Sequence, residues 1–292
     1  MILEKPSVLR FIAALALLMS LFSSFTFGGF VTFGNGFGSK WGDPVHGTAS
    51  DTITWSFMNQ GTTLATGHPL IADGATGTSD ISSLQTLFDG TYGGGAFNLA
   101  IQNAFNTWST AAAGRLTFQQ VADNGAPSGG TSAASSAIDI RIGAFHAGNN
   151  TPFSFSGAVG YGPPGDDLNF PDALAGDILI NLDSQFIRAA GNEGAIFYNG
   201  GTYQNDLEGL VLHELGHSAI GLGHPANGVG DVMYVGSFPD CCNFVNRQLS
   251  PDDIAGLQSV YGITAVPEPS SLWLISIVMA CLVSSVVRKT MC

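Results

Sequence analysis

The alternation of apolar and polar residues predicts four β-strands between residues 52 and 182. They cover residues 52–57, 115–121, 137–142 and 177–182. Three other segments, 96–113, 205–220 and 250–261, carry apolar residues three and four positions apart, which predicts amphipathic helices. Glycine- and serine-rich stretches at 61–80, 124–136 and 146–176 predict long loops between these elements. No charge block, repeat or long polar linker interrupts residues 41–265, so we expect one domain there.

The amino-acid composition limits the kinds of molecule that this protein can bind. Only 11% of the residues are charged, against roughly 25% in an average soluble domain, and 39 are glycine. A hydrophobic content of 45% is enough for a sizeable core. The formal net charge of -13 repels polyanions, which excludes nucleic acid as a partner. We expect a monomer.

The amino-terminal residues 1–27 have the pattern of a secretory signal peptide. Lys5 and Arg10 precede an apolar run from Phe11 to Phe22, which is short for a membrane span and is followed by serine, threonine and glycine. No A-x-A triplet marks a cleavage point. An uncleaved amino-terminal anchor therefore remains an alternative.

The carboxy-terminal residues 266–292 combine a proline-rich hinge, an apolar segment and a basic pair. Pro267-Glu268-Pro269 is followed by an apolar stretch from Leu272 to Val287 and then by Arg288-Lys289, which is typical of a short membrane helix. This order resembles the PEP-CTERM sorting signal of Gram-negative bacteria. The resemblance implies transient membrane insertion, recognition by an exosortase-type sorting machinery, and a final location at the cell surface or outside the cell.

The strongest chemical signal is His213-Glu214-Leu215-Gly216-His217 within the predicted helix 205–220. Residues four apart lie on one helix face, so His213 and His217 can bind one metal ion together. Glu214 is rotated about 100° from His213 and can reach a metal-bound water without binding the metal itself. Gly221 and Gly223 then break the helix and allow the chain to return His224 as a third ligand.

Further motifs surround this segment in a recognisable order. Met233-Tyr234 follows the histidines, and Leu249-Ser250-Pro251-Asp252-Asp253-Ile254 leads into the last predicted helix. Upstream motifs are Ile53-Thr54-Trp55-Ser56-Phe57, Ala104-Phe105-Asn106-Thr107-Trp108-Ser109, Leu116-Thr117-Phe118 and Ile138-Asp139-Ile140-Arg141-Ile142. Together they resemble the catalytic domain of the matrixins, a branch of the metzincin zinc proteases.

The resemblance implies an α+β fold of the metzincin (zincin-like) type. It has a twisted, mostly parallel five-stranded sheet with one antiparallel edge strand, and three helices. The edge strand, placed at residues 158–162, would bind an extended substrate peptide. The matrixin-like catalytic domain would cover residues 41–265.

By the same resemblance, His213, His217 and His224 bind one catalytic zinc ion. Glu214 acts as general base on the zinc-bound water and then protonates the leaving amine. Met233 supports the site from below, Tyr234 lines its wall, and Asp252 and Asp253 buttress it, although capping and packing explain the last three equally well.

Several departures from the family pattern leave questions open. Ala219 and Ile220 stand where the family has one residue, so His224 comes one position late. His224 can still bind the metal ion if a bulge or a longer last helical turn absorbs the extra residue. Asp231 is the alternative third ligand. Of the positions expected to bind a second, structural zinc, only His146 matches. Five aspartates either bind calcium or are merely solvated: Asp166, Asp167, Asp172, Asp177 and Asp183. Cys241 and Cys242 form a strained disulfide or remain free thiols, and no cysteine precedes them to act as a latency switch.

The leading hypothesis is therefore an exported zinc endopeptidase. The alternative hypotheses are a matrixin-fold surface or biofilm-matrix binding protein that the displaced third histidine has left inactive, and a structural protein whose histidine cluster is incidental.

Overall fold

The structure is a computed structural model that describes residues 31–32, 40–130, 138–164, 172–188, 198–199, 202–225, 230–234 and 246–262. The predicted signal peptide, the predicted sorting segment, Cys241 and Cys242 lie outside these residues. Among the described helices, none is both long and apolar enough to span a membrane.

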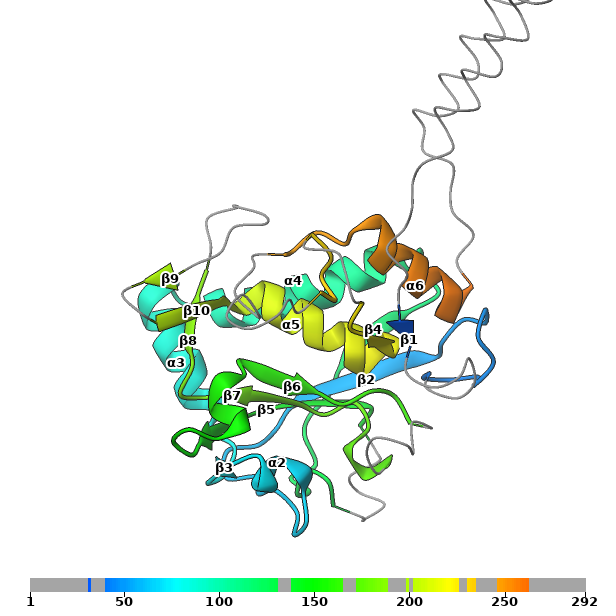
Figure 1. The fold of residues 1–292 in the computed structure, drawn as a ribbon. Coiled ribbons are helices and arrows are strands. Elements are labelled where there is room, and N and C mark those ends of the chain that lie inside the picture. The colour runs from blue at the N-terminus through cyan, green and yellow to red at the C-terminus, as the bar shows by residue number, and fades with distance from the viewer. Residues whose placement is uncertain are drawn as a thin grey trace, which may run out of the picture.

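A mixed sheet forms the centre of the fold (Figure 1). Its five strands run in the order β4 (Thr117–Gln120), β2 (Thr52–Phe57), β5 (Ile140–Ala147), β7 (Ile178–Asn181) and β6 (Ala158–Gly160). The first four are parallel, and β6 is antiparallel to β7 at the edge. The predicted five-stranded sheet with one antiparallel edge strand is thus confirmed. A sixth short strand, β3 (Ala75–Thr76), pairs with the far end of β5.

Two small sheets lie outside the central one. β1 (Val31–Thr32) pairs antiparallel with β11 (Leu222–Gly223). β10 (Thr202–Asp206) lies between β8 (Gln185–Ile187), to which it is parallel, and β9 (Tyr198–Asn199), to which it is antiparallel. The sequence pattern predicted neither, because β1, β9 and β11 have only two residues each, which is too few to show an alternation.

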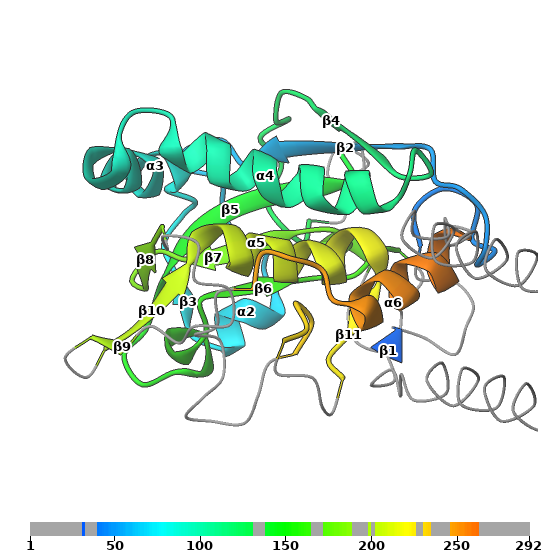
Figure 2. The same ribbon diagram turned by 90° about the horizontal axis from the view of Figure 1, so that it is seen from above.

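The three predicted helices are present as α4 (Ala96–Ala111), α5 (Leu207–Leu215) and α6 (Pro251–Tyr261). Figures 1 and 2 show α4 and α5 side by side on one face of the sheet. The main core lies between these helices and the sheet, where the Trp108 indole donates a 2.9 Å hydrogen bond to the Leu212 carbonyl and ties α4 to α5. The central sheet therefore positions α5, which carries His213.

The structure adds a short helix α2 (Pro69–Ala72), the longer α3 (Ile81–Tyr92), and two 3-10 turns at Pro152–Phe155 and Asp172–Leu174. The prediction missed α3, although its buried residues Ile81, Leu84 and Phe88 have helical spacing. Asp80 caps its first turn by accepting a hydrogen bond from the Ser83 amide. Serine, threonine and Gly90 within the segment weaken the helical signal.

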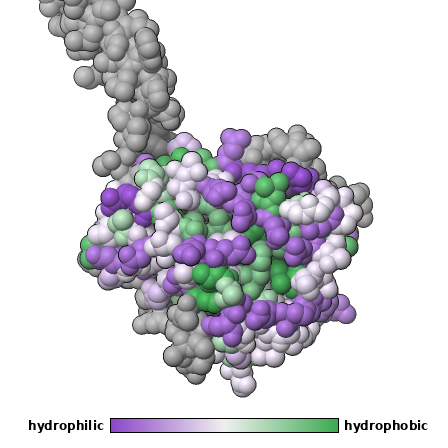
Figure 3. All heavy atoms as spheres, turned by 180° about the vertical axis from the view of Figure 1, so that it is seen from behind, coloured by the Kyte–Doolittle hydropathy of each residue, from purple (hydrophilic) through white to green (hydrophobic). Residues whose placement is uncertain are grey.

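The described surface mixes polar and apolar residues. The face shown in Figure 3 has hydrophobic areas interleaved with hydrophilic ones. In the described part of the chain, large hydrophobic side chains are exposed in different segments: Val45, Ile71, Leu87, Leu99 and Phe155. Single exposures of this kind are ordinary in soluble proteins.

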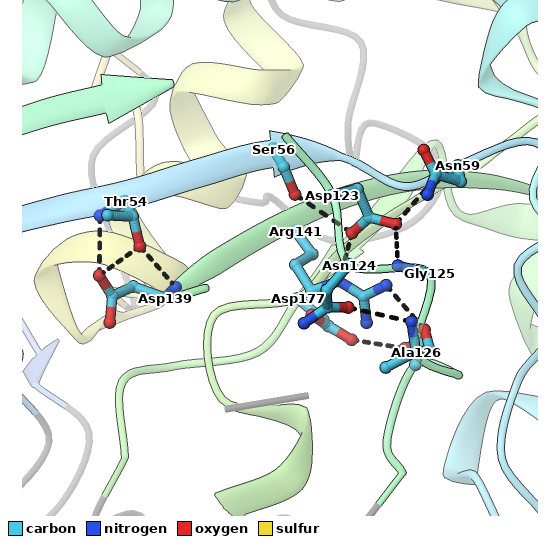
Figure 4. A network of polar contacts seen from close by, with 11 residues as sticks. Thr54, Ser56, Asn59, Asp123, Asn124, Gly125, Ala126, Asp139, Arg141 and Asp177 are labelled. Atoms are coloured by element: carbon cyan, nitrogen blue, oxygen red, sulfur yellow. Dashed lines mark hydrogen bonds and ion pairs between the residues drawn. The ribbon is translucent and has the colours of Figure 1, made fainter. Parts of the chain in front are cut away.

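A buried polar network crosses the sheet at β5 (Figure 4). The Arg141 guanidinium donates from Nε to the Asp123 carboxylate at 2.9 Å and from Nη2 to the Ala126 carbonyl at 2.7 Å. Nearby, the Ser128 hydroxyl donates a short hydrogen bond to the Asp177 carboxylate. Asp177 is the easier of the two carboxylates to protonate, because burial raises its pKa, whereas the hydrogen bond from Arg141 and those from backbone amides hold the pKa of Asp123 below its usual value.

We expect stability to depend on the ionisation of Asp177. Burial raises its pKa to about 7, and the Ser128 hydrogen bond and the Arg141 charge oppose that rise only in part. Because the folded pKa of Asp177 lies above the unfolded value, its contribution to the free energy of unfolding is fully present below about pH 4, where the carboxyl group is protonated in both states. This contribution, a few kcal/mol, is lost as the pH rises through about 7. Asp177→Asn should flatten this part of the profile, measured by urea unfolding between pH 4 and 8 with chelator present. Parallel profiles for the two proteins would refute the assignment.

Candidate metal centre

Helix α5 begins at a firmly held amino terminus. The Asp206 carboxylate accepts a 2.8 Å hydrogen bond from the Gly209 amide and caps the helix. Arg247 binds the same carboxylate through Nε at 2.8 Å and through Nη2. The apolar face of α5 is buried in the core at Leu207, Val211, Leu212 and Leu215. With its start and one face fixed, the helix presents His213 from a defined direction.

The three predicted histidines converge. The Nε2 atom of His213 lies 3.1 Å from those of both His217 and His224, and the Nε2 atoms of His217 and His224 are 2.8 Å apart. Among the described residues, these three form the one cluster with metal-ligand geometry. His217 is buried, His213 half-buried and His224 exposed, so the cluster opens to solvent on one side.

The protonation state of the histidine rings leaves nitrogen lone pairs free to bind a cation between them. His213 Nδ1 lies 2.6 Å from the Val232 carbonyl, and His217 Nδ1 lies 2.6 Å from the Leu222 carbonyl. A carbonyl only accepts, so both Nδ1 atoms carry the proton and both Nε2 atoms keep a lone pair. Burial lowers the pKa of His213 to about 4 and that of His217 well below its usual value, which keeps both rings neutral.

Two lone pairs 3.1 Å apart repel each other unless a cation lies between them. Three imidazole nitrogens at roughly 2.0–2.1 Å from a tetrahedral zinc ion lie about 3.3 Å from one another, close to the spacing found here. The donor set therefore fits zinc, and the cluster is open to solvent on the side of His224.

The extra residue before His224 is absorbed by a π-helical turn. α5 ends at Leu215, and Gly216–Ile220 continue it with the wider π-helical hydrogen bonding. Gly221 then adopts a left-handed conformation with φ 79°, which turns the chain into β11. The predicted longer last turn is thus present. His224 occupies the third position, and Asp231 is not part of the cluster.

Glu214 lies buried beside the histidines. Burial raises its pKa to about 8, and a hydrogen bond from the Gly160 amide of β6 opposes that rise. A Cβ atom at Gly160 would lie 2.8 Å from Glu214 Oε2, so only glycine fits here without displacing the carboxylate. The sequence pattern gave no signal for Gly160, because its contact with Glu214 comes from the packing of β6 against α5.

A cleft of about 340 Å³ opens beside Glu214 and the three histidines. Its lining includes the segment from Ser156 to Gly160, which contains β6, and also Leu210, Val232 and Tyr234. Tyr234, which the family resemblance assigns to the wall of the site, is thus among the residues that line this cleft.

Met233 packs against the helix that carries His213 and His217. It is buried, and a Cβ atom at Gly216 would lie 2.0 Å from its sulfur, so the methionine packs directly on the backbone of the turn between the first two histidines. The Asp253 carboxylate accepts from the amides of Val232 and Met233 at 2.9 and 3.2 Å, and also from that of Ser250. Asp253 thus caps α6 and holds the methionine turn at the same time.

The positions that the family resemblance assigns to a second, structural zinc have other surroundings here. His146, the one that matches, is paired with Asp183 at 2.8 Å. The other two positions hold Tyr161 and Leu179, which belong to a separate hydrophobic cluster. Of the acidic residues considered for calcium, Asp177 and Asp183 are engaged by protein groups, and Asp166 and Asp167 lie outside the described residues.

The class of the protein follows from this geometry. A mixed sheet with an antiparallel edge strand packs against a helix with H-E-x-x-H, a third histidine comes after a glycine turn, and a methionine packs on the glycine between the first two histidines. This combination defines a zinc metalloprotease of the metzincin class.

Comparison with known proteins identifies the family. The model of the matrixin family, peptidase M10, matches residues 91–262, which is more than half of the chain. The chain is 30% identical over 166 residues to human matrix metalloproteinase-19, covering 56% of this chain and 25% of that protein. It therefore belongs to the matrixin family and spans about a quarter of the length of this relative.

Proposed function

We propose that this chain is an exported zinc endopeptidase that cleaves peptide bonds at the three-histidine site. The observation that carries the proposal is the convergence of three Nε2 atoms, two of them with their lone pairs fixed inward, next to a buried carboxyl group. His213, His217 and His224 would hold the zinc ion.

When bound, zinc supplies Lewis-acid activation of water and of the substrate carbonyl. Glu214 would accept the proton of the attacking water and pass it to the leaving amine. Its burial favours the protonated form, whereas a cation at the triad favours the carboxylate, so these opposing effects suit a group that must take up and release a proton. Met233 and Tyr234 take no part in proton transfer.

The substrate would bind as an added strand. β6 pairs with β7 along one edge, and its residues also line the cleft. An extended peptide that forms main-chain hydrogen bonds with Ala158–Gly160 would lie across the histidines. Protein substrates that can present such an extended segment are the expected class.

Location and organisation complete the proposal. Residues 1–27 would direct export, 41–265 would form the catalytic domain, and 266–292 would engage a sorting machinery of the exosortase type through a transient membrane helix. The final location would be the surface or surroundings of a Gram-negative cell, with the protein acting as a monomer. Calcium binding in the acidic region of Asp166, Asp167, Asp172, Asp177 and Asp183 remains a prediction.

The test uses metal analysis together with hydrolysis of denatured casein. The purified full chain should hold about one zinc per molecule, and its activity should vanish with a chelator and return with added zinc. His224→Ala should lose most of the zinc, whereas His146→Ala, at a histidine outside the cluster, should keep it. Zinc binding without hydrolysis would favour the inactive binding protein instead. Absence of zinc would favour the structural protein.

A further inference from the structure

We propose that Trp41 and Tyr261 are positioning residues for the third histidine, because they hold the π-helical turn that carries the chain from His217 to His224. The inference rests on the proposed function only in taking zinc as the ion that the three histidines bind. It explains how a chain with one residue more than the family spacing still brings His224 into place.

The end of the π-helical turn leaves carbonyl groups without partners inside the helix. The Gly221 amide, the last one in this turn, donates to the carbonyls of Gly216 and His217. The next two carbonyls along the chain, those of Ser218 and Ala219, have no donor within the helix. This is true of the last carbonyls of every helix, because no later helical amide can reach them. Both residues are fully buried, so water cannot readily take the place of a partner.

Two side chains from distant parts of the sequence bind these carbonyls. The Trp41 indole Nε1 donates to the Ser218 carbonyl at 2.8 Å. The Tyr261 hydroxyl donates to the Ala219 carbonyl at 2.7 Å. Burial raises the pKa of Tyr261, so its hydroxyl keeps the proton that this bond requires.

The two donors are also fixed to each other. The backbone amide of Trp41 hydrogen-bonds to the phenol oxygen of Tyr261. The Lys40 ammonium lies 5.0 Å above the centre of the Tyr261 ring and donates to the Asp43 carbonyl at 2.6 Å. Trp41, Tyr261 and the turn therefore form one hydrogen-bonded unit that joins an amino-terminal segment, the end of α6 and the metal-binding helix.

The braced turn leads directly to the ligand. Gly221 and Leu222 follow it, the Leu222 carbonyl orients the His217 ring, and His224 comes two residues later. On its other side, β11 pairs with β1, with Val31 opposite Gly223. A shift of the turn would move both the carbonyl that orients His217 and the backbone that carries His224, so the two donors control how closely three nitrogens can converge.

The test measures zinc affinity without any substrate. Tyr261→Phe removes one hydroxyl and keeps the ring, and Trp41→Phe removes the indole donor. Partners that orient metal ligands typically contribute about 10- to 100-fold in metal affinity, so the double variant should bind zinc about 10- to 100-fold more weakly in competition with a chromophoric chelator. Each single variant should show a smaller loss in the same direction.

The matched control is Ser109→Ala, which removes another side-chain hydrogen bond to a backbone carbonyl, that of Leu116 at 3.1 Å, away from the site. It should leave zinc affinity unchanged. Thermal unfolding of the metal-free proteins separates a general loss of stability from a specific loss of affinity. Zinc affinity within twofold of the wild type in Tyr261→Phe, the conservative change, would overturn the inference. A wild type that binds zinc but cleaves nothing would refute the proposed function and leave this comparison valid.

Discussion

Glu214→Gln is expected to lower kcat/KM for peptide hydrolysis by about 10²- to 10⁴-fold while the zinc content stays at one per chain. The glutamine amide has the size of the carboxyl group and can still accept the hydrogen bond from the Gly160 amide. It cannot accept a proton from water, so the change removes the proposed general base and little else. Steady-state kinetics on a fluorogenic peptide, together with metal analysis of the same sample, measures both quantities.

Glu208→Gln is the matched control. Glu208 lies on the same helix, and its carboxylate accepts a 3.0 Å hydrogen bond from Asn103 rather than facing the histidines. The same change of charge at this position should leave kcat/KM within a few-fold of the wild type. If Glu214→Gln had the kcat/KM of the wild type, Glu214 would have no part in the mechanism. Equal losses of kcat/KM in both variants would indicate a general effect of charge on the helix.

The sequence was most informative where function depends on spacing along one helix. His213 and His217 are four residues apart, and that separation alone places them on one face. The strands at 52–57 and 177–182 were also readable, because apolar and polar residues alternate there, most clearly in Ile53-Thr54-Trp55-Ser56-Phe57, and β2 and β7 form within these ranges. Such features depend on local geometry, which the order of residues encodes directly.

Features that depend on tertiary packing could not be predicted in this way. The carbonyls of Val232 and Leu222 that orient the two histidine rings carry no side-chain signal. The contact of Gly160 with Glu214 joins an edge strand to a helix far along the chain. The π-helical turn could be inferred only as one way to absorb an extra residue, and the donors that stabilise it, Trp41 and Tyr261, come from opposite ends of the domain.

These distant contacts meet at the junction between α5 and the π-helical turn. Met233 packs on Gly216 from one side, while Trp41 and Tyr261 bind the end of the turn. Because the metal ligands lie on both sides of this junction, its backbone must stay fixed for three nitrogens to converge. Gly216 has no room for a side-chain carbon beside the Met233 sulfur, which makes it a sensitive position at which to test this account.

Gly216→Ala is expected to lower the free energy of unfolding by about 1–3 kcal/mol and to weaken zinc binding. Gly216 has helical backbone angles, with φ -57° and ψ -39°, so helix propensity alone would favour alanine by about 1 kcal/mol. The added methyl group, however, would lie 2.0 Å from the Met233 sulfur and 3.3 Å from Cζ2 of Trp108. Steric overlap therefore outweighs propensity. Urea unfolding of the metal-free protein and chelator competition measure the two effects.

The control and the rescue isolate that overlap. Gly90→Ala makes the same change inside α3, where a Cβ atom has nothing within 4 Å, and should stabilise the protein by about 1 kcal/mol. Met233→Ala alone creates a cavity at a cost of about 2–5 kcal/mol. In the double variant Gly216→Ala/Met233→Ala the new methyl group enters that cavity. The double variant should therefore be destabilised by less than the sum of the two single variants, with a coupling energy of about 0.5–3 kcal/mol. Strict additivity would show that the methionine does not pack against this turn, and the account of how the metal-binding helix is held in place would then be wrong.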